Sequence, residues 1–363
     1  SQPVQNTPTT LTVTAATNNS SELDPNIYGT VHSSQNNNSN NSVVLNQPVT
    51  TQSHTTVQGN QSVQDSQAAQ GNQNVSATAA DVAAVNNDDG LDPNIYGTVN
   101  VKDWDYQINN NILNLTNYHG LDKDHIIIPN LNDFSNANID INGVEGIGIT
   151  SQVLKNALGQ LNSQNSTIAF SKTSGSFSNK VIAENNNWES AFVTPEQIKI
   201  KYADLTNLDT SNITDMTAMF SVQDHLKVLT GLDSWNTSNV VNMKQMFQND
   251  SSLTVMDLSH WDTSSVTDMA FMFDMCNNLQ TVGNLSNWNT GNVTDMAGMF
   301  SQDGNIQTVG QLDNWDTSNV THMEDMFADM DNLKSVGDLS KWNISNVTDM
   351  AGMFVGTRSL QTV

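Results

Sequence analysis

The sequence predicts a repeat solenoid, preceded by a small α/β cap and a disordered N-terminal tail. One block, Trp-(Asp/Asn)-Thr-Ser-Asn-Val-Thr-Asp-Met-x-x-Met-Phe, recurs along the C-terminal part, and its six phenylalanines are 27, 26, 27, 27 and 27 residues apart. All 15 methionines fall between Met216 and Met353. The first hundred residues, by contrast, contain neither Lys nor Arg. A fixed period of this length is typical of a repeat architecture.

Each coil of 26–27 residues is expected to contain one short strand and one short helix. Within the block, Val, Met, Met and Phe occupy offsets 0, 3, 6 and 7, which is one face of a short helix. Between blocks, apolar residues such as Leu279, Val282 and Leu285 indicate a short buried strand. Gly283 follows this strand, and the 26-residue coil lacks the glycine, so we expect a bulge there. Stacked coils would bury both faces over residues 198–363.

Residues 101–197 are predicted to form a small α/β capping unit. Tyr106 and Ile108 alternate with polar residues, and the Asn-rich stretch 109–111 indicates a hairpin turn. Thr150 or Ser151 is a candidate N-cap for a following helix.

Residues 1–100 are predicted to be a disordered low-complexity tail. Tyr28 and Tyr96 are their only aromatic residues, so the segment has little apolar surface to offset the entropy of ordering its backbone. The phrase LDPNIYGTV occurs twice, at Leu23–Val31 and at Leu91–Val99. It is either a duplicated linker unit or a short motif that docks on a partner through Ile and Tyr.

Composition argues against several classes of function. The net charge of −25 repels nucleic-acid phosphates and anionic lipid surfaces, so neither nucleic acid nor membrane insertion is expected. Cys276 is the single cysteine, so an intrachain disulfide cannot form. The chain contains no nucleophile elbow, phosphate-binding glycine loop or Cys/His metal spacing. We therefore expect no enzyme, no catalytic residue, no cofactor and no metal site.

Two periodic columns allow a functional and a structural interpretation. The tryptophans could form an aromatic ladder for sugars, but core packing at the corner of each coil is favoured. The acidic column contains Asp215, Asp268, Asp295 and Asp349, with Asn242 and His322 in the other two copies. A calcium ladder is conceivable, but isolated acids without a ligand loop favour electrostatics at a helix terminus.

The blocks resemble the BspA-like leucine-rich-repeat surface proteins of Gram-positive bacteria, lactobacilli in particular. The match rests on segments such as Trp288–Met296 with Met299 and Phe300, and the segments around Asp103–Tyr106 and Ile126–Pro129 resemble that family's N-terminal cap. The resemblance implies a leucine-rich-repeat-like coil and a secreted, extracellular adhesin that is anchored to the cell wall. The sequence ends within a predicted strand, so the repeats are expected to be truncated and the anchor to lie in a missing C-terminal region.

A ligand-binding surface is predicted on the strand face of the coils. With the strand valines directed inward, their neighbours should point outward and line up in consecutive coils. The predicted contact residues are Gln280, Thr281, Gln307, Thr308, Lys334 and Ser335. The expected partner of the monomeric chain is a host glycoprotein, mucin or matrix protein, or a biofilm polymer. The alternative is a non-catalytic targeting or spacer region of a larger secreted, cell-wall-attached enzyme.

Overall fold

The computed structural model describes residues 99–361 and 363, all of which belong to one compact unit. The predicted disorder of residues 1–100 falls almost entirely outside the described residues. The same holds for the two copies of LDPNIYGTV, of which only Val99 is described. Val99 is partly buried and packs against the hydrophobic core.

A hairpin opens the described part of the chain. The 3-10 helix η2 (Val101–Asp103) leads into β1 (Trp104–Asn109), which pairs antiparallel with β2 (Ile112–Tyr118). Asn110 and Asn111 form the turn with φ values of 52° and 63°. Asparagine tolerates this left-handed region better than most residues, which explains why the turn lies at the Asn-rich stretch. The predicted hairpin is confirmed.

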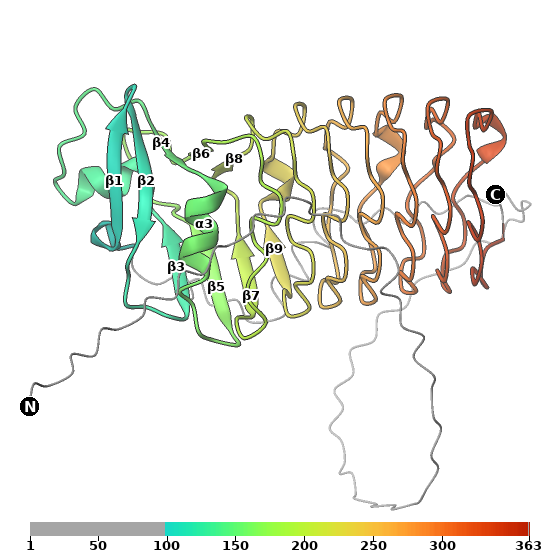
Figure 1. Ribbon diagram of the computed structural model, residues 1–363, viewed down its shortest axis with the longest axis horizontal. Coiled ribbons are helices and arrows are strands. Elements are labelled where there is room, and N and C mark those ends of the chain that lie inside the picture. The colour runs from blue at the N-terminus through green and yellow to red at the C-terminus, as the bar shows by residue number, and fades with distance from the viewer. Residues whose placement is uncertain (1–98, 362) are drawn as a thin grey trace, which may run out of the picture. The chain divides into compact units, whose positions relative to one another are not determined.

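Two sheets follow from this hairpin, with strand orders β1-β2-β4-β6-β8 and β3-β5-β7-β9 (Figure 1). Every pairing after β1–β2 is parallel. The remaining strands are β3 (His125–Ile128), β4 (Gly146–Ile149), β5 (Ser166–Phe170), β6 (Val181–Ala183), β7 (Ile200–Asp204), β8 (Leu208–Asp209) and β9 (Val228–Thr230). From β2 onward the chain alternates between the two sheets, so consecutive strands add to each sheet in turn.

Two short α-helices lie between the early strands: α2 (Leu131–Asn136) and α3 (Ser151–Leu158). The Thr150 hydroxyl accepts a hydrogen bond from the Val153 N–H at 3.2 Å, which confirms the predicted helix cap. Later in the chain, three 3-10 turns precede tryptophans: η3 (Leu232–Ser234), η4 (Leu285–Asn287) and η5 (Leu339–Lys341).

The predicted solenoid of strand-plus-helix, leucine-rich-repeat-like coils is wrong. The described residues form a mixed α/β structure with two sheets, and none of the recurring blocks contains an α-helix. In one block, Phe271 and Met275 have φ values of 57° and 64°, and a right-handed helix cannot pass through such residues. The Phe271 N–H donates instead to the Ala297 carbonyl of the following block at 2.8 Å. The 0, 3, 6, 7 spacing therefore reflects tight turns.

Consecutive blocks are nevertheless hydrogen-bonded to one another. Single parallel bridges connect, in order, Asn187, Asp215, Asn242, Asp268, Asp295, His322 and Asp349. Figure 1 shows these turns of the chain lying side by side in chain order beyond the labelled strands. The first bridge includes Asn187, which places Trp188 and Phe192 in a block that the sequence pattern did not identify. The repeat pattern is hard to recognise in this block because other residues occupy its Val and Met positions.

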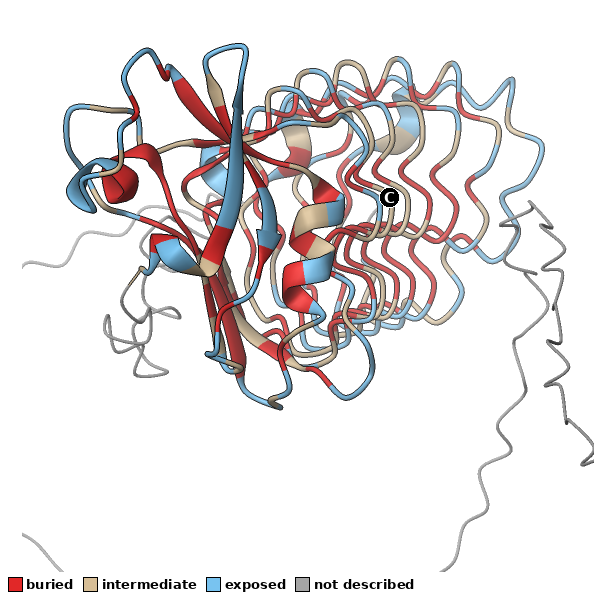
Figure 2. Cartoon of the chain, turned by 60° about the vertical axis from the view of Figure 1, so that its left-hand side comes forward, coloured by how far each residue is buried: buried red, intermediate tan, exposed pale blue. Residues whose placement is uncertain are grey.

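The core runs continuously through the blocks, as the buried segments in Figure 2 show. Phenylalanine rings stack from Phe192 through Phe354, with centroids 4.8–5.7 Å apart. The paired methionines of the inner blocks are fully buried against them, for example Met269 and Met272. The prediction that the Phe and Met columns are core is confirmed for the inner blocks, whereas in the last copy Met350 is exposed and Phe354 is partly buried.

Candidate functional site

The predicted contact residues lie in register on neighbouring blocks. Thr308 bridges Ser335 in a parallel pairing, and Val255 bridges Thr281 in the same way. The Lys334 N–H donates to the Gln307 carbonyl at 3.0 Å, and the Gln280 N–H donates to the Thr254 carbonyl at 2.8 Å. These contacts position one amide or ammonium side chain and one hydroxyl on each of three consecutive blocks.

The two halves of this row differ in exposure. Gln280, Gln307 and Lys334 are exposed, whereas Thr281, Thr308 and Ser335 are half-buried. The three hydroxyl oxygens accept hydrogen bonds from the N–H groups of Gly283, Gly310 and Gly337 at 3.0, 3.1 and 3.1 Å. The hydroxyls therefore hold the turn that follows, and the outward groups of the row are the two amides and the ammonium.

A direct contact joins two of these outward groups. Lys334 Nζ donates to Gln307 Oε1 at 2.7 Å, across neighbouring blocks. Lys334 is the only Lys or Arg between residues 245 and 340 of the sequence, and this contact holds its ammonium group beside a neutral amide. We define Gln280, Gln307 and Lys334 as the outer polar row. Its groups can donate and accept hydrogen bonds at the regular spacing of the blocks.

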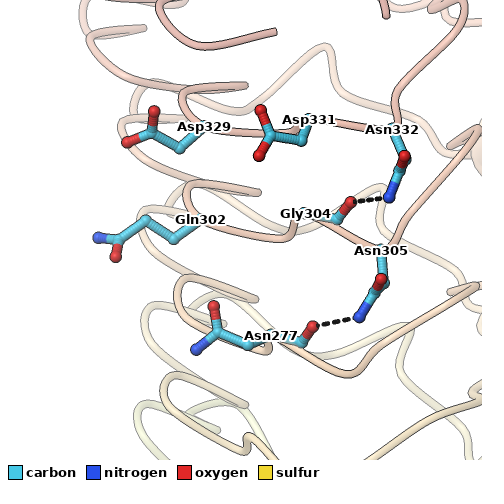
Figure 3. Close-up of a pocket in the computed structure, with 7 residues that line it drawn as sticks. All are labelled: Asn277, Gln302, Gly304, Asn305, Asp329, Asp331 and Asn332. Carbon is cyan, nitrogen blue, oxygen red and sulfur yellow. Dashed lines mark hydrogen bonds between the residues drawn. The ribbon is translucent and has the colours of Figure 1, made fainter. Parts of the chain in front are cut away.

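A polar hollow of about 350 Å³ lies on another edge of the blocks (Figure 3). Its lining consists of Asn277, Gln302, Gly304, Asn305, Asp329, Asp331 and Asn332. Two of these side chains are structural, because Asn305 Nδ2 donates to the Asn277 carbonyl and Asn332 Nδ2 donates to the Gly304 carbonyl, each at 2.7 Å. Sequence reasoning did not identify this hollow. The available signal was an asparagine before the apolar segment of three successive blocks.

The charge within the hollow is partly neutralised. Arg358 Nη1 lies 3.2 Å from Asp331 Oδ1. The Asp329 side chain lies against Gly356, where an added Cβ would come within 2.1 Å of Asp329 Oδ1. In the part of the chain that the structure describes, no group of three His, Cys, Asp or Glu side chains could hold a metal ion. The hollow offers amide and carboxylate groups for polar contacts.

The tryptophans do not form a surface platform for sugars. Trp235, Trp261, Trp288 and Trp315 are only 3–6% exposed, which confirms the core interpretation. Their rings stack in part of the array, with centroids 6.3 Å apart for Trp288 and Trp315. Each indole N–H donates to a carbonyl of the preceding block, as Trp288 Nε1 does to Leu258 O at 3.0 Å.

The acidic column has a local structural role that differs from the predicted one. Asp295 Oδ1 accepts the N–H of Ala297 at 3.0 Å, and Asp268 Oδ1 accepts that of Ala270 at 2.9 Å. The interpretation as helix-terminus electrostatics is wrong because no helix follows these residues. Burial raises the pKa of Asp268, and the nearby Asp295 carboxylate adds to that rise. The column is a row of side-chain-capped turns.

One family model matches the part of the chain that contains the stacked blocks. The family model described as "Mycoplasma protein of unknown function, DUF285" matches residues 186–302 and again residues 275–362. The first match begins next to Asn187, where the stacking begins in the structure. No curated protein matches the chain, and no solved structure does. Among the described residues, no helix has the length and apolar character needed to cross a membrane.

Proposed function

We propose that this chain is a cell-surface adhesin that binds a host or biofilm macromolecule through the outer polar row. The observation that carries the proposal is the exposure of Gln280, Gln307 and Lys334 at the same position of three consecutive blocks. The finer assignment to BspA-like surface proteins belongs to the same proposal and rests on blocks such as Trp288–Phe300.

The proposed partner is an extended polymer: a mucin, another host glycoprotein, a matrix protein or a biofilm polysaccharide. Such polymers present hydrogen-bonding groups repeatedly along their length, and the outer polar row does the same. A single amide or ammonium contact at an exposed surface is weak. Many copies of the chain on one cell would raise the total strength through multivalency. The proposed location is extracellular, with attachment to the cell wall.

The test is binding of the full chain to immobilised mucin, matrix proteins and biofilm polysaccharide. The test variant combines Gln280→Ala, Gln307→Ala and Lys334→Ala. The same three blocks offer a matched control, because Asn287, Asn314 and Lys341 form a second exposed row with two amides and one lysine. The control variant therefore combines Asn287→Ala, Asn314→Ala and Lys341→Ala.

We expect the wild-type chain and the control variant to bind equally, and the test variant to lose most of its binding. If the wild-type chain binds none of these polymers, the adhesin proposal is wrong, and a spacer or targeting role becomes the better account. If the test variant binds as well as the wild type, the outer polar row is the wrong surface.

A further inference from the structure

A column of buried residues, three of them polar or acidic, runs through the core of the stacked blocks. It is formed by the third residue after each phenylalanine of the Phe column, namely Gln223, Asp250, Cys276, Asp303 and Met330. Asp250, Cys276 and Asp303 are each 0% exposed. Two carboxyl groups thus lie in the interior, with one thiol in the block between them.

Each carboxyl group accepts a single hydrogen bond from the part of the chain that the structure describes. Asp250 Oδ1 accepts the Gln223 N–H at 2.7 Å, and Asp303 Oδ1 accepts the Cys276 N–H at 2.9 Å. Among the described residues, no group donates a hydrogen bond to the second oxygen, Oδ2, of Asp250 or of Asp303. A buried carboxylate normally has its charge balanced or its oxygens fully hydrogen-bonded, because desolvation of an unpaired charge is costly. Neither condition is met for Asp250 or Asp303.

The titratable groups that face this column add no balancing charge. Asp224 lies near Asp250 and is itself paired with Lys199 at 2.8 Å and with His225 at 2.7 Å. Asp274 lies near Asp303. The Cys276 thiol, which donates to the Phe247 carbonyl at 3.0 Å, lies near both Asp250 and Asp303. The nearby charges are therefore carboxylates, and the cations near Asp224 already have a partner.

We propose that Asp250 and Asp303 are proton-binding groups that make the stability of the stacked blocks depend on pH. The blocks are more stable at acidic pH and open more readily at alkaline pH. As neutral carboxylic acids they can remain in the core, with Oδ1 accepting the neighbouring N–H. On losing the proton, each would place a negative charge in a column that contains no counter-ion. The least costly response is local opening of the blocks that admits water to the carboxylate. This inference is independent of the proposed adhesin function.

The direction of the pH effect follows from burial. Burial raises the pKa of Asp250 and of Asp303 well above the ordinary value of 3.8, and the neighbouring Asp224 and Asp274 carboxylates raise them further. A carboxyl whose pKa is higher in the folded than in the unfolded state stabilises the fold fully below the unfolded-state pKa of about 3.9. That contribution is lost as the pH rises through the folded-state pKa. Stability should therefore fall from acid toward alkaline pH.

The experiment measures the Tm of the full chain between about pH 5 and about pH 8. For the wild type we expect a fall of at least about 4 °C across this range. The variant Asp250→Asn, Asp303→Asn keeps an oxygen acceptor at Oδ1 and cannot ionise, so its Tm should vary much less with pH. The control Asp316→Asn also removes one negative charge, from an exposed position whose counterparts in the neighbouring blocks are Asn289 and Asn343. It should retain the wild-type pH dependence.

A second readout does not require the variants to fold. Infrared spectroscopy of the wild-type chain at neutral pH should show the carbonyl band of a protonated carboxylic acid, absent from the unfolded chain. The proposal is overturned if that band is missing at neutral pH. It is also overturned if the Asp250→Asn, Asp303→Asn variant folds and its Tm falls with pH as steeply as that of the wild type.

Discussion

At the scale of single residues, the tryptophan of each block combines ring packing with one directed hydrogen bond. Trp288 is 3% exposed, stacks on Trp315, and donates its indole N–H to the Leu258 carbonyl. The side chain therefore joins three successive blocks. Its apolar surface is buried and its indole N–H is hydrogen-bonded, which is the usual condition for a buried tryptophan.

We predict that Trp288→Ala lowers the free energy of unfolding by roughly 3–5 kcal/mol, the range for a large aromatic residue lost from a core. Denaturant unfolding measures the change. Trp342→Ala is the matched control, because Trp342 is only half-buried and, among the described residues, stacks on Trp315 alone, with ring centroids 6.5 Å apart. It should cost clearly less. Equal losses, or an unchanged midpoint for Trp288→Ala, would contradict the core role.

The sequence is informative about such residues because their identity repeats. Trp, Phe and Met recur at fixed positions, and an apolar residue that recurs in every copy is readily predicted as core. Asp250 and Asp303 could not be predicted as buried in the same way. Their position is occupied by Gln223, Cys276 and Met330 in other copies, so the column has no constant chemical character. Only the structure shows that the position faces inward.

At the scale of elements, backbone conformation decides what each block becomes. In the middle of the block one position has positive φ in successive copies, and it is occupied by Ala218, Gln245, Phe271, Gly298, Asp325 and Gly352. Only two of these six residues are glycine. Because Ala218, Gln245 and Phe271 give no sign of a left-handed conformation, the spacing of Val, Met, Met and Phe suggested a helix. The parallel bonds between blocks, which replace helical bonds, depend on neighbours about 27 residues away and have no local sequence signal.

Glycine does mark a different turn, the one after the apolar segment. Gly310 has a φ of 95°, and an added Cβ would lie 2.4 Å from Asn284 Oδ1 and 3.2 Å from the Leu285 nitrogen. We predict that Gly310→Ala lowers the free energy of unfolding by more than about 1 kcal/mol through backbone strain and this clash. Gly304→Ala is the control, since its nearest contact would be the Asp329 carbonyl at 3.8 Å. A thermal melt in which both variants behave alike would refute the prediction.

At the scale of the whole molecule, the sequence separated a polar N-terminal region from a structured remainder. The hairpin and the helix that Thr150 caps were predictable, because each depends on local turn or capping chemistry. The two-sheet arrangement was not, because parallel pairing between β3, β5 and β7 joins residues that are 34–42 positions apart in the sequence. Their registers depend on the packing of the whole core.

The predicted disorder of residues 1–100 leads to a proteolysis experiment. No Lys or Arg precedes Lys102, so trypsin should leave residues 1–101 attached to the core. A protease of broad specificity should remove them quickly and leave a resistant product that begins near Val99. Mass spectrometry of the digest identifies that product. Resistance of residues 1–90 to the broad-specificity protease would show that the predicted disorder is wrong.

The parallel bonds between blocks also have a mechanical consequence. Each inner block is bonded to the block before it and to the block after it, as Asp268 is to Asn242 and Asp295. Tension applied along the stack would act on these bonds between neighbouring blocks. If the blocks separate one after another, each step would release the 26 or 27 residues of one block. The chain would then extend in steps of nearly equal length, and the work needed to break the bonds of each block would be dissipated at each step.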